Sequence, residues 1–358
     1  MNIWVFILAL LIFLSGQHLL LALFAVKRIT YSRHFSVDAL HEGEKAELVE
    51  VLRNPTPIFI PWIRAESRIS PFLRFGQQEN LSVSGERFHK SIFFLGPFKQ
   101  ITRRHKVTFT HRGIYDVGSV ALTVGDLVGL CDKPRDIHCD CKICVYPRLL
   151  NDESLPFSFS RLQGDMIVRA HYLPDPFLVN GIRSYRPGDQ IHSIHWPATA
   201  KSGNLMVRTH DYTADTRLLV VLNAQLKENQ WGNLMDYEMP AVEHAISLAA
   251  TICVRLMQNG LNAGFCANMP MGDKKECVYF TPEKNYSSAD ELLYAFAALK
   301  ITTAKSFLTF LESLYSLRDL DILILSAYTS PSVEERMQTL RKLGNHVTLH
   351  LLSEEAAS

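Results

Sequence analysis

The feature that most constrains this chain is an uncharged apolar segment near its beginning. The residues from Asn2 to Val26 read NIWVFILALLIFLSGQHLLLALFAV and include no Asp, Glu, Lys or Arg. As a helix this segment reaches roughly 36 Å, which exceeds the ~30 Å hydrocarbon core of a bilayer. We therefore predict a transmembrane anchor at residues 1–28.

A cleavable signal peptide is the alternative interpretation of this segment. A signal peptide needs a basic start, a short apolar core and a cleavage site with small residues, whereas this start is uncharged and the apolar run is long. Lys27 and Arg28 follow the segment, and no Lys or Arg precedes it. The positive-inside rule then places the following domains in the cytoplasm. We expect a single-pass protein of the inner (cytoplasmic) membrane with cytoplasmic domains.

The charge balance and the cysteine count argue against two other classes of protein. The chain has 37 Lys and Arg against 36 Asp and Glu, so it lacks the basic excess typical of nucleic-acid binding. Its seven Cys are an odd number, which favours free thiols in a reducing compartment over a set of disulfides. We predict no nucleic-acid partner.

Beyond the anchor, the hydrophobic pattern divides the chain into three parts. Residues 35–150 contain short strands closed by Gly or Pro, which predicts an antiparallel β-sandwich-like domain. Within it, Pro61 indicates an edge strand or a bulge. Residues 215–353 alternate continuous apolar strands with amphipathic helices, which predicts a doubly wound α/β domain with a parallel sheet. Residues 151–214 link the two domains.

The linking segment holds the densest group of functional side chains. Residues 183–203 read RSYRPGDQIHSIHWPATAKSG. Pro187 and Gly188 suit the centre of a type II turn, which needs a positive φ at its second central position. Asp189 is then expected to cap a helix, with its carboxylate accepting hydrogen bonds from free backbone N–H groups.

The second half of this segment predicts a short helix packed between the two domains. Ile191 and Ile194 fall at helical spacing and are expected to face the core, and Trp196 is expected to be the apolar anchor of the helix. After the turn at Pro187 and Gly188, we expect a second short turn that begins at Pro197 and ends at Gly203.

Two functional interpretations compete with this structural one. The basic side chains left on the surface could dock a protein partner. Alternatively, Asp189, His192 and His195 could form the active site of a hydrolase or metal-dependent enzyme, because a spacing of three places both His on one helical face. The chain has no Gly-x-Ser-x-Gly elbow, His-Glu-x-x-His, phosphate loop or dinucleotide fingerprint. We therefore predict no cofactor and favour a non-enzymatic role.

The linking segment resembles the motif of the domain-of-unknown-function 58 family, bacterial membrane-associated proteins often encoded beside MoxR-type AAA+ ATPases. That motif has an Arg-x-Tyr, then Pro-Gly-Asp, Ile-x-Trp, Ala, Gly and Leu-x-Val-Arg. Upstream, HRGIYDVG, GDLVGL and VYPRLL are similar to further segments of the family. The matching residues are Arg183, Tyr185, Pro187, Gly188, Asp189, Ile194, Trp196, Ala200, Gly203, Leu205, Val207 and Arg208. The expected interaction surface consists of Arg183, Tyr185, Pro187, Gly188, Asp189, Ile194, His195, Trp196, Gly203 and Arg208.

The resemblance implies a von Willebrand A-like fold for residues 215–353. In that fold the first strand often ends in Asp-x-Ser-x-Ser, whose oxygens hold Mg²⁺. Here Asn223, Gln225 and Lys227 occupy the three positions, and Ser326 stands where a later strand would supply an Asp. Because Mg²⁺ prefers several oxygen ligands that include carboxylates, and a Lys ammonium repels it, we predict no metal at this site.

A cysteine cluster offers a separate metal hypothesis. The sequence IHCDCKICVYP places Cys139, Cys141 and Cys144 beside His138. Three thiolates and an imidazole could form a tetrahedral Zn²⁺ site, but the spacing is uncommon and a distant second pair of ligands is missing. The alternative is a set of free thiols at a hairpin tip, with Cys144 as a small buried hydrophobic residue.

The anchor, the resemblance and the degenerate metal motif predict a membrane-anchored, non-enzymatic scaffold or adaptor. Its α/β domain would recruit a protein partner, and the resemblance implies a MoxR-type AAA+ ATPase. An enzyme built on residues 183–208 is the alternative. A β domain that binds ligands outside the cell is a third possibility, and it requires the opposite membrane orientation.

Overall fold

A computed structural model gives the structure of the protein. Two compact units make up the chain: Met1–Arg148 with Phe296–Ala298, and Leu149–Ala295 with Leu299–Ser358. The structure describes residues 3–20, 28–76, 81–84, 88–125, 133–151, 155, 179–187, 189–210, 217–230, 234–282 and 289–352.

The N-terminal apolar segment forms a helix. Helix α1 extends from Ile3 to Leu20 and contains no charged residue. By length and hydropathy, one helix among the described residues qualifies as a candidate membrane span, Met239–Gln258 in the second unit. Its apolar window is 67% buried inside the protein, which is typical of the core helix of a folded domain. In α1, the apolar stretch Ile3–Gly16 is shorter than the length that this criterion requires.

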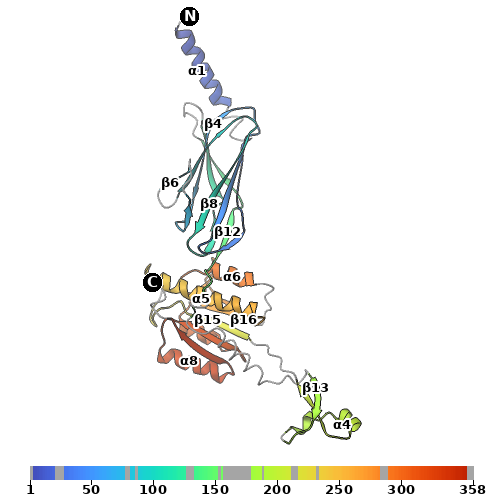
Figure 1. Ribbon diagram of the computed structural model, residues 1–358. Coiled ribbons are helices and arrows are strands. Elements are labelled where there is room, and N and C mark those ends of the chain that lie inside the picture. Colours follow the sequence, from blue (N-terminus) through green and yellow to red (C-terminus); the bar gives the residue numbers. More distant parts are fainter. Residues whose placement is uncertain are drawn as a thin grey trace. The chain divides into compact units, whose positions relative to one another are not determined.

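The first unit is rich in strands, which form three sheets. Their strand orders are β1-β3-β8-β5, β11-β10-β4-β7-β6 and β2-β12-β9, and the long strands are seen in Figure 1. Neighbouring strands pair antiparallel except β2 with β12, which are parallel. The strand bounds are β1 Thr30–Phe35, β2 Ala39–His41, β3 Lys45–Arg53, β4 Ile60–Arg68, β5 Leu73–Phe75, β6 Leu81–Ser84, β7 Phe88–Leu95, β8 Gln100–Phe109, β9 Gly113–Asp116, β10 Ser119–Gly125, β11 Lys133–His138 and β12 Lys142–Tyr146.

Alternating side chains form the core between the two larger sheets. In β3, Ala46, Leu48 and Leu52 are buried while their neighbours are partly exposed. One core cluster contains residues of β1, β3, β4, β7 and β10, so the two sheets pack face to face as a sandwich. Burying a Leu or Phe in such a core contributes about 1.5–3 kcal/mol. The unit therefore has the predicted sandwich-like architecture, and its first strand begins before residue 35.

Pro61 lies inside a central strand and not at an edge. Strand β4 pairs with β10 on one side and β7 on the other. The register with β7 shifts between Ile60 and Ile63, and such a bulge accommodates a residue that has no backbone N–H. Of the two alternatives predicted for Pro61, the bulge is confirmed and the edge strand is wrong.

The chain enters and leaves the sandwich at opposite ends. Thr30, the first residue of β1, pairs with Arg53, the last residue of β3. At the other end of β3, the N–H of Glu42 donates to the carbonyl of Tyr146, the last residue of β12, at 2.9 Å. The nine residues of β3 separate these two ends by about 30 Å, at ~3.3 Å per residue.

The second unit contains an α/β sheet of five strands with the order β17-β16-β15-β18-β19. Strands β15, β16, β18 and β19 pair in parallel, and β15 is buried from Leu218 to Leu222, as expected of a sheet covered on both faces. Figure 1 shows α5 and α8 on opposite faces of this sheet. The bounds are β15 Arg217–Leu222, α5 Met239–Gln258, β16 Asn262–Pro270, β17 Cys277–Phe280, α6 Ala289–Ala298, α7 Phe307–Ser313, β18 Asp321–Ser326, α8 Pro331–Lys342 and β19 His346–Leu351. The end of α6, Phe296–Ala298, is grouped with the first unit.

Strand β17 departs from the predicted parallel arrangement. It pairs antiparallel with β16, because residues 271–276 form a short return and a parallel neighbour would require a long crossover. The other strands keep the predicted doubly wound alternation. Since β15 is bordered by β16 on one side and by β18 on the other, the carboxyl ends of β15 and β18 flank the switch point of the sheet. Open α/β sheets form their ligand crevice at that point.

Candidate functional site

The predicted motif forms a small hairpin module in the second unit. Strands β13 (Val179–Ser184) and β14 (Met206–His210) pair antiparallel, and a 3₁₀ turn, η4 (Ile191–Ser193), and helix α4 (Trp196–Ser202) lie between them. The N–H of Tyr185 donates to the carbonyl of Leu205 at 2.8 Å, and Arg208 pairs with Ile182. The predicted turn residue Gly188 lies outside the described residues.

Arg183 and Asp189 fix the first turn of this module. Arg183 donates from Nη1 and Nη2 to the two carboxylate oxygens of Asp189 at 2.7 and 2.6 Å. The backbone N–H of Arg186 donates to the same carboxylate at 2.7 Å. These hydrogen bonds lower the pKa of Asp189 to about 2, and the hydrogen bond from Arg183 contributes most. Asp189 therefore closes the turn that contains Pro187, and the prediction that it caps a helix was wrong.

His195 has the capping role that was predicted for Asp189. Its Nδ1 accepts a hydrogen bond from the N–H of Ala198 at 3.1 Å, and α4 begins at the next residue with Pro197 in its first turn. Gly203 ends the helix with a φ of 72°, a left-handed conformation that Gly adopts without strain. The predicted short turn from Pro197 to Gly203 is confirmed.

The same geometry keeps the candidate catalytic residues apart. The Asp189 carboxylate is held by Arg183 and Arg186, and His195 is held by the helix that it caps. His192 lies in the separate 3₁₀ turn. Among the described residues, no hydrogen bond or ion pair joins Asp189, His192 and His195 to one another. The module does not assemble an Asp–His pair.

Several apolar side chains of the module are exposed. Ile194 and Val207 are 8% and 3% exposed and form a bridge with each other. Ile194 is therefore buried as predicted. Trp196 is 64% exposed and Ile191 is 75% exposed, so the predictions that Ile191 faces a core and that Trp196 is the apolar anchor of the helix were wrong. An exposed Trp and Ile beside basic residues have the composition of a protein-binding surface.

At the carboxyl edge of the α/β sheet, polar side chains bond to one another. Asn223 donates from Nδ2 to Oγ of Ser326 at 3.0 Å. The Oδ1 atom of Asn223 accepts from Nδ2 of Asn268 at 3.1 Å and from the N–H of Gln225 at 3.0 Å. Asn268 in turn accepts from the N–H of Ala224 at 2.7 Å. We name Asn223, Gln225, Asn268 and Ser326 the amide cluster.

The remaining hydrogen-bonding groups of the amide cluster are also used within the protein. Ser326 donates to the carbonyl of Tyr328 at 2.7 Å, and Oε1 of Gln225 accepts from the N–H of Phe307 at 2.6 Å. Lys227, the third degenerate position, is exposed. Mg²⁺ sites draw on several oxygens and usually on carboxylates. A set of buried amides that already bond to one another, with an ammonium nearby, does not fit that ion.

A crevice of about 390 Å³ lies beside the amide cluster, at the switch point of the sheet. Its walls include Val242 and other apolar residues of α5, and Lys227 and His244 also line it. Burial lowers the pKa of His244, which favours the neutral ring. The carboxylate of Glu238 accepts from the N–H of Met235 at 2.9 Å and is therefore already engaged. The crevice combines apolar walls with several polar and charged side chains, and such a combination can bind a ligand or a partner.

The three predicted cysteine ligands do not converge. Cys141 and Cys144 are buried and Cys139 is half-buried, and Cys141 packs in a core cluster with Phe109. Burial raises the pKa of Cys141 to about 12 and that of Cys144 to about 11, so both thiols are protonated at neutral pH. Among the described residues, one group of His, Cys or acidic side chains lies close enough to share a metal ion, and it contains none of these cysteines. The positions of the cysteines do not support a zinc site.

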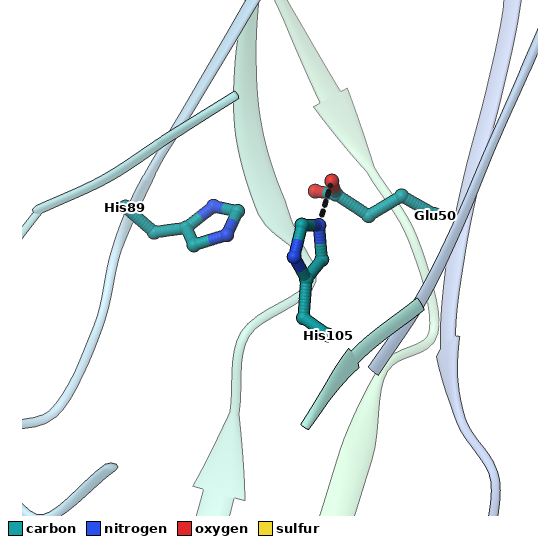
Figure 2. A group of neighbouring side chains, drawn as sticks. All are labelled: Glu50, His89 and His105. Carbon is teal, nitrogen blue, oxygen red and sulfur yellow. Dashed lines mark hydrogen bonds and ion pairs between the residues drawn. The ribbon is translucent and has the colours of Figure 1, made fainter. Parts of the chain in front are cut away.

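That group is formed by Glu50, His89 and His105 inside the β-sandwich (Figure 2). Their ligand atoms lie within 4.8 Å of one another, and each residue is at most 3% exposed. The Nε2 atom of His105 lies 2.8 Å from Oε2 of Glu50. Because Glu50 and His105 belong to one sheet and His89 to the other, the group connects the two layers of the sandwich.

Arg33 brings a positive charge into the same group. Its Nε lies 3.6 Å from Oε1 of Glu50, and its Nη2 lies 3.3 Å from Nδ1 of His89. Tyr31 donates to Oε1 of Glu50 at 2.7 Å. Burial alone would raise the pKa of Glu50, but the hydrogen bond from His105 and the charge of Arg33 lower it to about 2. Burial lowers the pKa of His89 to about 3, so this ring is neutral.

We name Tyr31, Arg33, Glu50, His89 and His105 the buried charge network. A buried carboxylate must be paired and hydrogen-bonded, and Arg33 already pairs with Glu50. A divalent cation bound to the same carboxylate would stand close to the guanidinium, which disfavours it. The network therefore fits a structural role. The sequence analysis missed it, although Glu50 lies in the buried phase of its strand, between Leu48 and Leu52.

Comparison with known proteins finds a family match for part of the chain. Residues 181–347 match the sequence model of the family described as Protein of unknown function DUF58. This range runs from the motif hairpin into β19. Uncharacterized protein YeaD of Bacillus subtilis (strain 168) is 22% identical over 253 residues, which are 69% of this chain and 58% of YeaD. The chain thus spans less than two thirds of the length of that relative.

Solved structures resemble about a third of the chain. The CARDB domain of the PF1109 protein from Pyrococcus furiosus, solved with di-metal ions, is 16% identical over 33% of this chain and 86% of its own, with a TM-score of 0.22. A non-cellulosomal cohesin from Archaeoglobus fulgidus is 10% identical over 32% of this chain and 91% of its own, with a TM-score of 0.23. Scores of this size do not establish a shared fold.

Proposed function

We propose that this protein is a membrane-anchored, non-enzymatic scaffold whose α/β domain binds a protein partner. The amide cluster is the observation that carries this proposal. It places mutually bonded amides, in place of metal ligands, beside a crevice with apolar walls. Such an arrangement supports binding over metal-assisted chemistry.

Helix α1 supports the membrane anchor in this proposal. Its side chains Trp4 and Phe13 are 76% and 64% exposed, and the helix contains no charge. An apolar helix with its side chains exposed is favoured in lipid and disfavoured in water. Arg28 follows the apolar segment, so the positive-inside rule supports a single pass through the inner membrane with cytoplasmic domains. A reporter fused to the C-terminus, active only in the cytoplasm, tests this orientation, and an inactive reporter contradicts it.

The α/β domain is proposed to have a von Willebrand A-like fold that has lost its metal. The strand order, with one antiparallel edge strand and a crevice at the switch point, supports this assignment. The fold then serves as a rigid frame for a binding surface, because a fold does not by itself specify an activity.

The docking surface is assigned to the crevice and its exposed border. Met235 and Tyr237 are 62% and 79% exposed, and Tyr237 lines the crevice. Met and Tyr are enriched in protein interfaces, and Tyr is frequent among residues that dominate binding energy. Lys227 adds a positive charge at the same place. The family resemblance suggests a MoxR-type AAA+ ATPase as the partner.

Affinity purification of the full chain from membranes, with a slowly hydrolysed ATP analogue, tests the partner. A MoxR-type AAA+ ATPase should co-purify with the unsubstituted chain. Tyr237→Ala should lower its affinity about 30-fold, the effect of losing a hot-spot side chain worth ~2 kcal/mol. Tyr294→Ala is the matched control, because Tyr294 is 50% exposed on α6 and does not line the crevice.

The possible outcomes test the identity of the partner and the location of the docking surface separately. If no AAA+ ATPase is ever enriched, the proposed partner is wrong. If the ATPase binds equally well to the Tyr237→Ala chain, the crevice is not its docking surface. An enzymatic turnover that is lost in His195→Ala while α4 stays folded would favour the alternative of an enzyme built on residues 183–208.

A further inference from the structure

Two loops meet at the end of the β-sandwich where the chain enters it. Loop 54–59 connects β3 to β4, and loop 96–99 connects β7 to β8. The N–H of the buried Asn54 donates to the carbonyl of Lys99 at 2.9 Å, and the N–H of Phe98 donates back to loop 54–59 at 3.1 Å. The two loops therefore form one continuous surface, which we name the sandwich rim.

The sandwich rim presents aromatic side chains to its surroundings. Phe59 is 52% exposed and Phe98 is 70% exposed. Phe94, one residue before the end of β7, is 63% exposed. Clustered exposed Phe side chains are uncommon on a protein surface that faces only water, and they mark a site of contact with a partner or a membrane.

The backbone of Phe98 is held in a conformation that its side chain disfavours. Its φ is 53°, a left-handed value that is rare for a bulky residue. Pro97 precedes it. In a turn with Pro at the first central position and a positive φ at the second, the second position favours Gly. A strained residue of this sort persists where its side chain has a use, and here the aromatic ring is what a Gly would lack.

The chain that comes from helix α1 arrives at this rim. Ile29 is 3% exposed and belongs to the same core cluster as Ile60, the residue that follows loop 54–59. The preceding residue, Arg28, is exposed. Among the described residues of this stretch and of the rim, the charged side chains are Arg28, Arg53 and Lys99, and all three are basic and exposed.

We propose that the sandwich rim binds the membrane surface next to the anchor. Phe59 and Phe98 insert at the level of the lipid headgroups, and the basic residues lie against anionic headgroups. This inference rests on the anchor of the proposed function and adds a second membrane contact, made by the β domain. A second copy of the chain could cover the same side chains, but the attachment to an apolar helix and the basic charge of Arg28, Arg53 and Lys99 favour lipid.

Photo-crosslinking of the full chain in vesicles of phosphatidylcholine and phosphatidylglycerol tests this inference. Benzoyl-phenylalanine replaces Phe59, Phe98 or Phe72 in separate chains. Phe72 is the matched control: it is 41% exposed and lies beside β5, which pairs with the far end of β8. Mass spectrometry should find at least about tenfold more lipid adduct at positions 59 and 98 than at 72, the ratio expected from burying one Phe ring.

Flotation of the same vesicles reports the anchor separately. If the chain floats with the lipid but positions 59 and 98 give no more lipid adduct than 72, the rim inference is wrong and the anchor stands. If positions 59 and 98 crosslink to a second copy of the chain, the rim is a protein interface and the inference is also wrong. If the chain does not float, both the anchor and the rim contact are overturned.

Discussion

Asn223 and Ser326 stand at the carboxyl ends of two adjacent parallel strands, β15 and β18, and a hydrogen bond of 3.0 Å from Nδ2 to Oγ joins them. Both residues are at most 2% exposed. The amide of Asn223 acts here as donor and acceptor at once. A carboxylate in its place could only accept and would carry a buried charge.

Asn223→Asp should therefore lower the free energy of unfolding of the α/β domain. The expected loss is about 3 kcal/mol, from one unmade hydrogen bond and an unpaired buried charge. Urea denaturation of the full chain, followed by hydrogen exchange of β15 and β18, measures it. The exposed Asn229 provides the same chemical change as a control, and Asn229→Asp should stay within about 0.5 kcal/mol of the unsubstituted chain. Equal stability of the two variants would contradict the role of the amide cluster.

Divalent metal should not stabilise the unsubstituted α/β domain. A ligand that binds only the folded state raises the midpoint of thermal unfolding, and the amide cluster offers no carboxylate to Mg²⁺. We expect the same midpoint in millimolar Mg²⁺ and in a chelator, measured by differential scanning calorimetry. A Mg²⁺-dependent rise that Asn223→Ala removes would show that these amides bind the ion.

The β domain should become less stable in mild acid because of His89. Burial lowers the pKa of His89 to about 3 from an ordinary value of 6.5. Between these values the unfolded chain binds a proton that the folded chain does not. The free energy of unfolding therefore falls as the pH drops from about 6.5 towards 3, by up to ~1.4 kcal/mol per pH unit. Glu50 acts in the same direction only below its ordinary value of 4.5.

His89→Gln should flatten this dependence between pH 6.5 and 4.5, where Glu50 does not yet contribute. Hydrogen exchange of β3 and β8, corrected for the intrinsic rate at each pH, reports the stability of the domain. His111→Gln is the control, because His111 is exposed. If the His89→Gln and unsubstituted chains have the same slope, the buried ring does not resist protonation. His89→Asn offers a second test if His89→Gln does not fold.

Phe98→Gly should stabilise the β domain although it removes a large side chain. Gly adopts a positive φ without strain, so relief of the strained backbone should raise the free energy of unfolding by about 1 kcal/mol. Phe59→Gly is the matched control, because Phe59 is also exposed but does not have a positive φ. That variant should be neutral or destabilised. Thermal unfolding compares the two, and a loss of stability in both would mean that the φ of Phe98 carries no cost.

His195→Ala should loosen the start of α4. The Nδ1 of His195 satisfies the N–H of Ala198, and loss of an N-cap costs roughly 1 kcal/mol, or about fivefold faster exchange of that amide. His192→Ala should leave the exchange of Ala198 unchanged, because His192 lies outside this helix. Residue-resolved hydrogen exchange decides between them. Equal exchange in both variants would remove the capping role.

The sequence predicts the architecture of this protein better than it predicts which side chains interact with one another. The hydrophobic period differs between the strands of the sandwich and the helices of the α/β segment, because each period reflects which faces of a strand or helix are buried. Strand β17 was the exception. Its apolar run is short, and the direction of a short buried strand depends on the length of the connection that precedes it.

The local roles in the motif were exchanged for a geometric reason. Composition favours Asp over His as a helix cap, yet Asp189 sits within reach of Arg183, and a bidentate ion pair competes successfully for the carboxylate. Local sequence patterns cannot predict the buried charge network. Glu50 and His105 are 55 residues apart in the chain, and only the pairing of β3 with β8 brings them together.

The opposite placement of Thr30 and Tyr146 on the β-sandwich gives this domain a mechanical consequence. A chain that enters at one tip and departs from the other converts the sandwich into a stiff spacer, whose length is set by how many residues its strands contain. Removing one pair of residues from every long strand would shorten the distance between the entry point and the exit point by roughly 7 Å. The separation between the two ends of the sandwich is thus encoded in strand length.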